Sequence, residues 1–176
     1  MNGAVPPAVT AKVAEPPGRT SALAGRSVTK YGGPLIIIDF GTATTYGVIA
    51  SNGEFLGGVI SPGIATSAAA LHQNTAQLPD VELVLPETAV CMNTANSIQA
   101  GILFGAIDAM TGMVQRLQSE ILQRESKKAV VLATGGFSKF VAEHSKIIQH
   151  LETSLVLDGI RLIYKRVQRQ VKKSIR

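Results

Sequence analysis

One stretch constrains the fold more than any other, because it pairs an apolar run with an acid. The apolar residues Leu35 to Ile38 run directly into Asp39. Consecutive β-branched residues are typical of a strand that is covered on both faces of a sheet. Asp39 is the only carboxylate between Glu15 and Glu54, and a buried charge is costly without a partner. The pattern predicts a strand whose acid meets a cation or several donors, or else a simple Asx-type turn.

A glycine and a cluster of hydroxyl residues follow this acid. Gly41 allows a tight turn and leaves room for a ligand to approach the backbone. Thr42, Thr44 and Thr45 supply hydroxyls and neighbouring backbone N–H groups, which suit phosphate oxygens. The turn is therefore a candidate phosphate site.

The next residues predict a three-strand antiparallel meander. Residues 46–50 and 54–60 are apolar enough for two further strands, and Asn52-Gly53 lies between them. An Asn-Gly pair is a strong signal for a tight hairpin. The first turn of the meander is built for a ligand, whereas the second only reverses the chain.

Two helices are expected after the meander. Residues 64–73 are Ala-rich, and a short extended piece is expected around residues 81–83, between two prolines. A long helix is predicted over residues 98–117 from its apolar spacing, with Asn93 or Thr94 as its cap. The polar stretch 118–128 is expected to end it. Gly101 and Gly105, one turn apart, cost helix propensity and suggest close packing, in a core or at a subunit interface.

A second strand-to-glycine junction lies near the end of the chain. Residues 129–133 predict a buried strand, which leads into Thr134-Gly135-Gly136 and a helix from about Ser138. Bare backbone beside a helix N-terminus is a common nucleotide-site geometry, although many strand-to-helix turns use glycine. A last helix is expected over residues 158–167.

Composition narrows the class of protein. The chain is 45% hydrophobic but only 16% charged, which fits a domain partly covered by another domain or subunit. Residues 1–30 are rich in Ala, Pro, Ser and Thr and are expected to pack poorly, with a transit peptide left open. No apolar run approaches the roughly 18 residues of a membrane span. Cys91 is the one cysteine, which fits a reducing compartment, and it is expected to be a small buried side chain. The three histidines lack metal-ligand spacing.

The net charge of +5 comes from the end of the chain. Seven Lys and Arg residues and no acid follow Asp158, so the remainder is net acidic. The basic residues lack interleaved aromatic side chains for stacking bases. A solvated basic tail at residues 168–176 is expected, and nucleic-acid binding is disfavoured.

Together the two glycine junctions resemble those of the acetate kinase, sugar kinase, Hsp70 and actin superfamily, and more closely the C-terminal half of type III pantothenate kinases. The segments that carry the resemblance, in family order, are Tyr31–Pro34, Asp39–Thr45, Asn52-Gly53, Leu56–Gly58, Pro62-Gly63, Leu78-Pro79, Asn93-Thr94, Ser97–Gly101, Ala133–Gly136 and Leu157–Gly159. The resemblance implies an α/β fold, a ribonuclease-H-like domain over residues 31–167, with a mixed sheet, a three-strand meander and flanking helices.

The resemblance also implies an activity and a set of partners. Family members are phosphotransferases that use ATP to phosphorylate the alcohol of pantothenate, giving 4'-phosphopantothenate, the first step of coenzyme A biosynthesis. They need a monovalent cation, potassium or ammonium, and magnesium is expected with the ATP. They act as homodimers, and the implied location is the cytoplasm, without membrane attachment.

The site residues follow position by position from the resemblance. Asp39 matches the monovalent-cation ligand, and Thr42, with Gly41 and Thr44 beside it, matches the residue that contacts ATP phosphate. Thr94 matches a pantothenate contact that comes from the neighbouring subunit. The segment near the adenosine is matched by Thr134, Gly135 and Gly136.

Two family segments have no match. The family opens with a D-x-G-N-T phosphate loop and has a G-x-D-R segment, before the position of Tyr31, that supplies the catalytic base. This chain contains neither, and no Asp precedes Asp39, so no catalytic residue is assigned and the chain alone is expected to be inactive. A truncated gene model, a fragment or a decayed paralogue would each explain this. The alternatives are a non-catalytic accessory or transcription-regulatory protein of the same family, and a subunit that completes another chain's site through Thr94.

Overall fold

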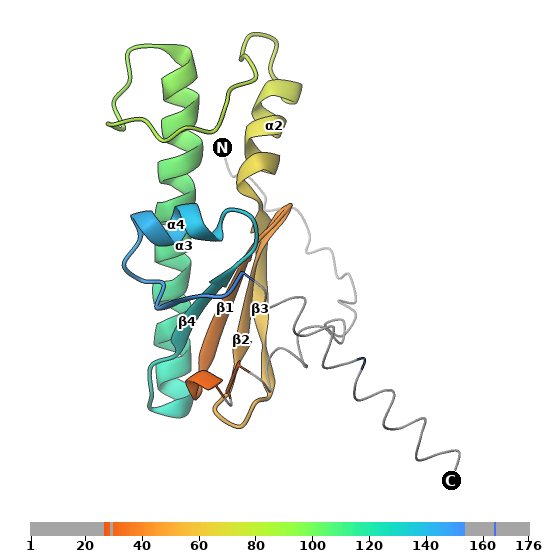
Figure 1. Cartoon of the computed structure of the whole chain (residues 1–176), viewed down its shortest axis with the longest axis vertical. Coiled ribbons are helices and arrows are strands. Elements are labelled where there is room, and N and C mark those ends of the chain that lie inside the picture. The colour runs from red at the N-terminus through yellow and green to blue at the C-terminus, as the bar shows by residue number, and fades with distance from the viewer. Residues whose placement is uncertain (1–26, 29, 154–163, 165–176) are drawn as a thin grey trace, which may run out of the picture.

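The computed structural model describes residues 27–28, 30–153 and 164. The described elements run in the order β1 (Leu35–Phe40), β2 (Ala43–Ile49), β3 (Phe55–Pro62), α2 (Ile64–Asn74), α3 (Thr94–Glu125), β4 (Val130–Thr134), α4 (Ser138–His144) and β5 (His150–Leu151). The five strands form one mixed sheet in the order β3-β2-β1-β4-β5. The first three are antiparallel neighbours, whereas β4 is parallel to both β1 and β5. The predicted mixed sheet, meander and flanking helices are confirmed (Figure 1).

The β2–β3 hairpin forms where the Asn-Gly pair predicted it. Gly53 has φ +88°, a conformation that costs glycine little. Its N–H donates to the Ala50 carbonyl, and the Glu54 N–H donates to the Asn52 side chain. Hydrogen bonds from the Ser51 hydroxyl and from its backbone N–H, the latter at 3.1 Å, lower the pKa of the Glu125 carboxylate at the end of α3. The hairpin is thus attached to the end of the long helix.

One face of the sheet packs against α3 and forms the main core. Alternate residues of a strand point to the same face, and Ile36, Ile38 and Phe40 of β1 all lie on this side. From α3, Leu103, Met110, Val114, Leu117 and Ile121 complete the cluster. Tyr46 of β2 lies in the same core, and its pKa is raised because burial disfavours the phenolate.

The opposite face carries a smaller apolar cluster. Leu35, Ile37, Ile49 and Leu132 are its buried members. Val28 and Tyr31 pack against it from the segment just before β1, where Ser27 and Val28 are helical. Folded structure therefore begins upstream of the predicted boundary at residue 31.

The long helix begins at a predicted cap but extends further than its apolar pattern indicated. Its N-cap is Asn93, one of the two residues expected there, and the Asn93 side chain accepts a hydrogen bond from the Asn96 N–H at 2.8 Å. The helix ends within the polar stretch 118–128, as predicted, but it continues to Glu125, beyond the apolar pattern that reaches Leu117. The apolar residues Leu117 and Ile121 still pack on the sheet there, so tertiary contacts extend the helix beyond its apolar sequence pattern.

The glycines of α3 do not make the close contacts within this chain that the sequence suggested. A Cβ at Gly101 or Gly105 would meet no atom within 4 Å. In Figure 1 the first part of α3 extends beyond the sheet alongside α2, away from the strands. By length and composition alone α3 could cross a membrane, contrary to the expectation from apolar runs, but this is weak evidence because core helices pass the same test.

Several other predictions have mixed outcomes. The expectation of a buried Cys91 was wrong, since it is partly exposed and its thiol donates to the Thr88 carbonyl at 3.2 Å. No group of three metal-ligating His, Cys, Asp or Glu side chains occurs among the described residues. The predicted helix 158–167, apart from Tyr164, the basic tail 168–176 and residues 1–26 lie outside the described residues.

The core packing predicts a difference between two leucines of α3. Leu103 is 1% exposed and Leu122 is 44% exposed. We expect Leu103→Ala to lower the free energy of unfolding by about 2–5 kcal/mol, because it leaves a cavity. Leu122→Ala is the control and should cost less than about 1 kcal/mol. Urea denaturation measures both, and equal losses would contradict the assignment of this face of α3 to the core.

Candidate functional site

The two glycine junctions lie side by side at the ends of adjacent strands. Because β1 and β4 are parallel, their carboxyl ends meet at one edge of the sheet, where Asp39 is paired with Thr134. The Phe137 N–H approaches the Phe40 carbonyl at 3.4 Å, which links the two turns directly. The fold therefore brings together the two motifs that sequence reasoning singled out separately.

Gly135 fits so tightly against the first junction that a side chain has no room there. Its φ is +92°, and a Cβ would lie 2.5 Å from Asp39 Oδ1 and 2.7 Å from the Phe40 backbone. Gly136, the next residue, would meet no atom within 4 Å. Of the pair, only the first glycine is required by the geometry within this chain.

A second glycine and a threonine hold the threonine-rich turn from the other side. The Gly63 N–H donates to the Thr42 carbonyl at 3.0 Å, and a Cβ on Gly63 would collide with the carbonyls of Gly41 and Thr42. The Thr66 hydroxyl, in the first turn of α2, donates to the same Thr42 carbonyl at 2.6 Å. Sequence reasoning missed Thr66, because a contact across 24 residues leaves no local pattern.

The three threonines of the turn do not share one environment. Thr42 is exposed at the turn, and Thr45 is paired with Asp39 across β1 and β2. Thr44 is buried, and strand alternation places it on the opposite face from Asp39 and Thr45. The structure thus places Thr42 at the junction and turns Thr44 toward the α3 side of the sheet.

At the second junction, Thr134 and Ser138 are both buried but differ in hydrogen bonding. The Ser138 hydroxyl donates to the Gly135 carbonyl at 2.6 Å, closing the turn before α4. Thr134 is 2% exposed, and its hydroxyl has no hydrogen-bond partner among the described residues. Buried polar groups normally have a partner, so this hydroxyl calls for an explanation.

Thr94 does not join this cluster. It is exposed at the first turn of α3. Figure 1 shows that this end of α3 extends beyond the sheet, whereas the glycine junctions directly follow strands β1 and β4. The segment before it is also open, with Met92 fully exposed and Val90 88% exposed. Within one chain, Thr94 is separate from the glycine junctions.

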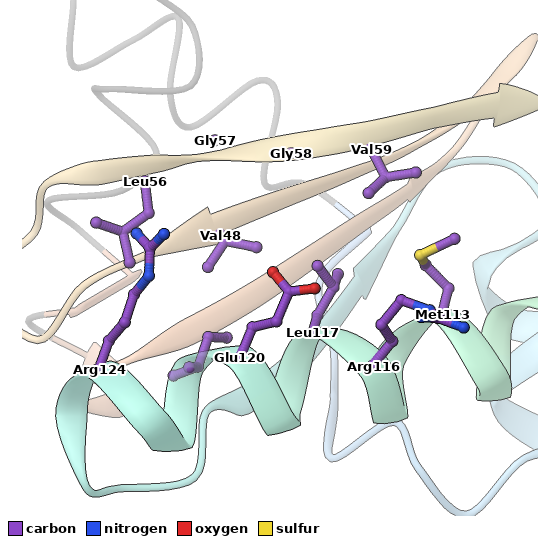
Figure 2. Close-up of a pocket in the computed structure, with 11 residues that line it drawn as sticks. Val48, Leu56, Gly57, Gly58, Val59, Met113, Arg116, Leu117, Glu120 and Arg124 are labelled. Carbon is purple, nitrogen blue, oxygen red and sulfur yellow. The ribbon is translucent and has the colours of Figure 1, made fainter.

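A cavity of about 200 Å³ lies elsewhere, between β3 and the second half of α3. Figure 2 shows Arg116, Glu120 and Arg124 projecting from α3 over the apolar side chains of the strands. None of the residues predicted for the site lines it. Apart from Thr94, the residues predicted for the site therefore lie at the strand ends and not around this cavity.

Comparison with known proteins identifies the family. The sequence model described as type III pantothenate kinase matches residues 19–116, more than half of the chain. The chain belongs to the type III pantothenate kinase family. Curated type III pantothenate kinases from Exiguobacterium sp. and Koribacter versatilis are each 44% identical to it, over 149 and 144 residues.

The match to these kinases is partial on their side. The aligned regions cover 85% and 82% of this chain but only 56% and 51% of the two relatives. The chain thus spans about half the length of the curated kinases that it matches. The family match begins at residue 19, upstream of the boundary predicted at residue 31.

Solved structures of low sequence identity share the fold. A Campylobacter jejuni protein described as a conserved Baf family transcriptional activator aligns with a TM-score of 0.58 at 18% identity, covering 89% of this chain and 68% of that one. MreB 5 of Spiroplasma citri bound to AMPPNP aligns with a TM-score of 0.54 at 12% identity, covering 89% of this chain and 60% of that one. A third structure is the activator of the 2-hydroxyisocaproyl-CoA dehydratase from Clostridium difficile with bound ADPNP. It aligns with a TM-score of 0.50 at 12% identity, covering 90% of this chain and 69% of that one. The chain therefore shares its mixed α/β fold with these three proteins.

The two adjacent glycines provide a matched test of the junction. We expect Gly135→Ala to lower the free energy of unfolding by at least about 1–3 kcal/mol, because a left-handed alanine is strained and its Cβ would also crowd Asp39. Gly136→Ala should change it by no more than about 0.5 kcal/mol. Chemical denaturation measures both variants. If they were equally stable, the close contact between the two turns would be wrong.

Proposed function

We propose that this chain supplies the nucleotide-binding and cation-binding half of a pantothenate kinase, in which ATP phosphorylates the alcohol of pantothenate to give 4'-phosphopantothenate for coenzyme A biosynthesis. The observation that carries the proposal is the pairing of Asp39 with Thr134, which joins two family motifs at one edge of the sheet. Phosphoryl transfer depends mainly on positioning and charge neutralisation, and a rigid junction of two turns suits that task. The family's place in coenzyme A synthesis favours the cytoplasm.

The first turn is proposed to hold the ATP phosphates. Thr42 is exposed there, while its carbonyl is held by Gly63 and Thr66, so its hydroxyl stands on a fixed backbone. Gly41 leaves that backbone open to a ligand. Thr134, Gly135 and Gly136 are proposed to lie near the adenosine, as the family resemblance implies. Thr44 is proposed only as part of the turn's framework, because it is buried on the other face.

Asp39 is proposed as the ligand of a monovalent cation, potassium or ammonium. It is partly buried, and an acid at such a place is stabilised by positive charge. When bound, the cation supplies positive charge beside the phosphates, and magnesium is proposed to accompany the ATP. The surrounding groups are hydroxyls and glycine backbone, which are oxygen-rich and compact, so the donor set fits a hard cation.

Pantothenate is proposed to contact Thr94 of a second copy of the chain. Thr94 begins α3, and this end of the helix extends beyond the sheet (Figure 1). A Cβ at Gly101 or Gly105 of α3 would meet no described atom within 4 Å. A homodimer packed on this surface would bring one copy's Thr94 to the other copy's site. We also propose a kinase-half domain that begins a few residues before the predicted boundary at residue 31, since Val28 packs on the sheet, and that ends near residue 167 before a basic tail.

Catalysis needs a base for which this chain carries no match, so we propose that turnover requires an N-terminal kinase half. The test is ADP production from ATP by the purified chain with pantothenate and potassium, alone and with a separately expressed N-terminal half of the Exiguobacterium relative. Turnover only in the mixture is expected. Turnover by the chain alone would mean that another group supplies the base, and silence in both would overturn the kinase proposal.

The phosphate role of Thr42 is tested by nucleotide binding. We expect Thr42→Ala to weaken binding of a non-hydrolysable ATP analogue by about tenfold, since a hydrogen bond to a charged group contributes about 1.5–3 kcal/mol. Thr42→Ser keeps the hydroxyl and should bind normally. Isothermal titration calorimetry measures all three proteins. A change of less than about twofold in Thr42→Ala would contradict the assignment.

A further inference from the structure

The strongest unexplained feature of the molecule is the buried hydroxyl of Thr134. The side chain is 2% exposed, yet its oxygen has no hydrogen-bond partner among the described residues. Leaving such a group unsatisfied is unfavourable, and a valine of nearly the same shape would avoid this. The only other described residue with such an atom is Ser27, which precedes β1 and lies outside the glycine junctions.

The sheet places this hydroxyl beside Asp39. The two residues are register partners in the parallel β1–β4 pair, where neighbouring strands are about 4.8 Å apart. Alternation puts both on the face of Ile37 and Leu132. The next residue, Gly135, packs so closely against Asp39 that a Cβ on it would lie 2.5 Å from Asp39 Oδ1. The Asp39 carboxylate and the Thr134 hydroxyl are therefore neighbours on one face of the sheet, without a direct hydrogen bond between them.

The chemistry of this pair favours a cation over an anion. A phosphate oxygen next to Thr134 would also face the negative charge of Asp39, which repels it. A cation instead accepts both oxygens as ligands. The group has one carboxylate, and no cluster of three acidic, His or Cys side chains exists among the described residues. A single negative charge with neutral oxygens suits a monovalent ion better than calcium, which takes several carboxylates.

We propose that the Thr134 hydroxyl is a side-chain ligand of the monovalent cation held by Asp39, and not merely a neighbour of the adenosine. This inference rests on the proposed function, because it takes the cation site at Asp39 as given. It explains why a hydroxyl is buried without a partner in the protein. The Thr134 hydroxyl lies at the end of β4, which is paired in register with β1.

The test titrates thallium(I) nitrate, a probe for potassium sites, into the nucleotide-free full chain, with thallium NMR as the readout. We expect Thr134→Val to weaken thallium binding by about tenfold or more, and Thr134→Ser to retain it. Ser27→Ala is the matched control, since it removes the other unpartnered buried hydroxyl and should leave thallium affinity unchanged. Thallium binding to Thr134→Val within about twofold of the parent chain would overturn the proposal.

Thermal denaturation separates a ligand role from a structural one. Without monovalent cations, Thr134→Val should melt at the same temperature as the parent chain or higher, because it removes an unsatisfied group. Added potassium should then raise the melting temperature of the parent chain but hardly that of the variant. A Thr134→Val protein that is less stable without cations, yet stabilised by potassium as strongly as the parent, would overturn the ligand role.

ATP-analogue binding in the absence of monovalent cations distinguishes this inference from the proposed function. If the parent chain binds the analogue but not thallium, the cation site at Asp39 and Thr134 is wrong while the nucleotide site stands. If it binds thallium in a Thr134-dependent way but never the nucleotide, the cation site stands and the kinase proposal fails.

Discussion

The parallel pairing of β1 with β4 is the interaction on which the rest of the site depends. Two strands separated by about ninety residues of chain become neighbours, and their carboxyl ends then lie at one edge of the sheet. Asp39 and Thr134 meet there as register partners. A slip of one residue would turn one of them to the opposite face, so the buried apolar alternation of both strands also fixes the chemistry at their ends.

Around this pairing, the backbone is packed too closely for side chains. Gly135 lies against Asp39 and Phe40, and Gly63 lies against the carbonyls of Gly41 and Thr42. Hydrogen bonds from Gly63 and Thr66 converge on the Thr42 carbonyl. The threonine-rich turn is consequently held from α2 on one side and from the β4–α4 junction on the other. Such a fixed backbone suits the phosphate binding that we propose for this turn.

The long helix α3 serves two different parts of the molecule. Its second half completes the core on one face of the sheet, through residues such as Val114 and Ile121. Its first half extends beyond the strands and carries Thr94 and the open glycines (Figure 1). A chain that spans about half of its kinase relatives and leaves this surface open fits the proposed need for further subunits or segments.

The sequence by itself determined the meander, the Asn-Gly hairpin, the two glycine junctions and the family, because these depend on local patterns: apolar runs, turn residues and short motifs. It did not show how far α3 extends and it misjudged the burial of Cys91, since contacts with the sheet extend the helix and an exposed loop holds the cysteine. Only the tertiary structure set Thr44 on the opposite face from Asp39, brought Thr66 to the turn and left the Thr134 hydroxyl buried without a partner. These features depend on strand register and long-range packing, which are set by residues far apart in the sequence and cannot be inferred from one local stretch.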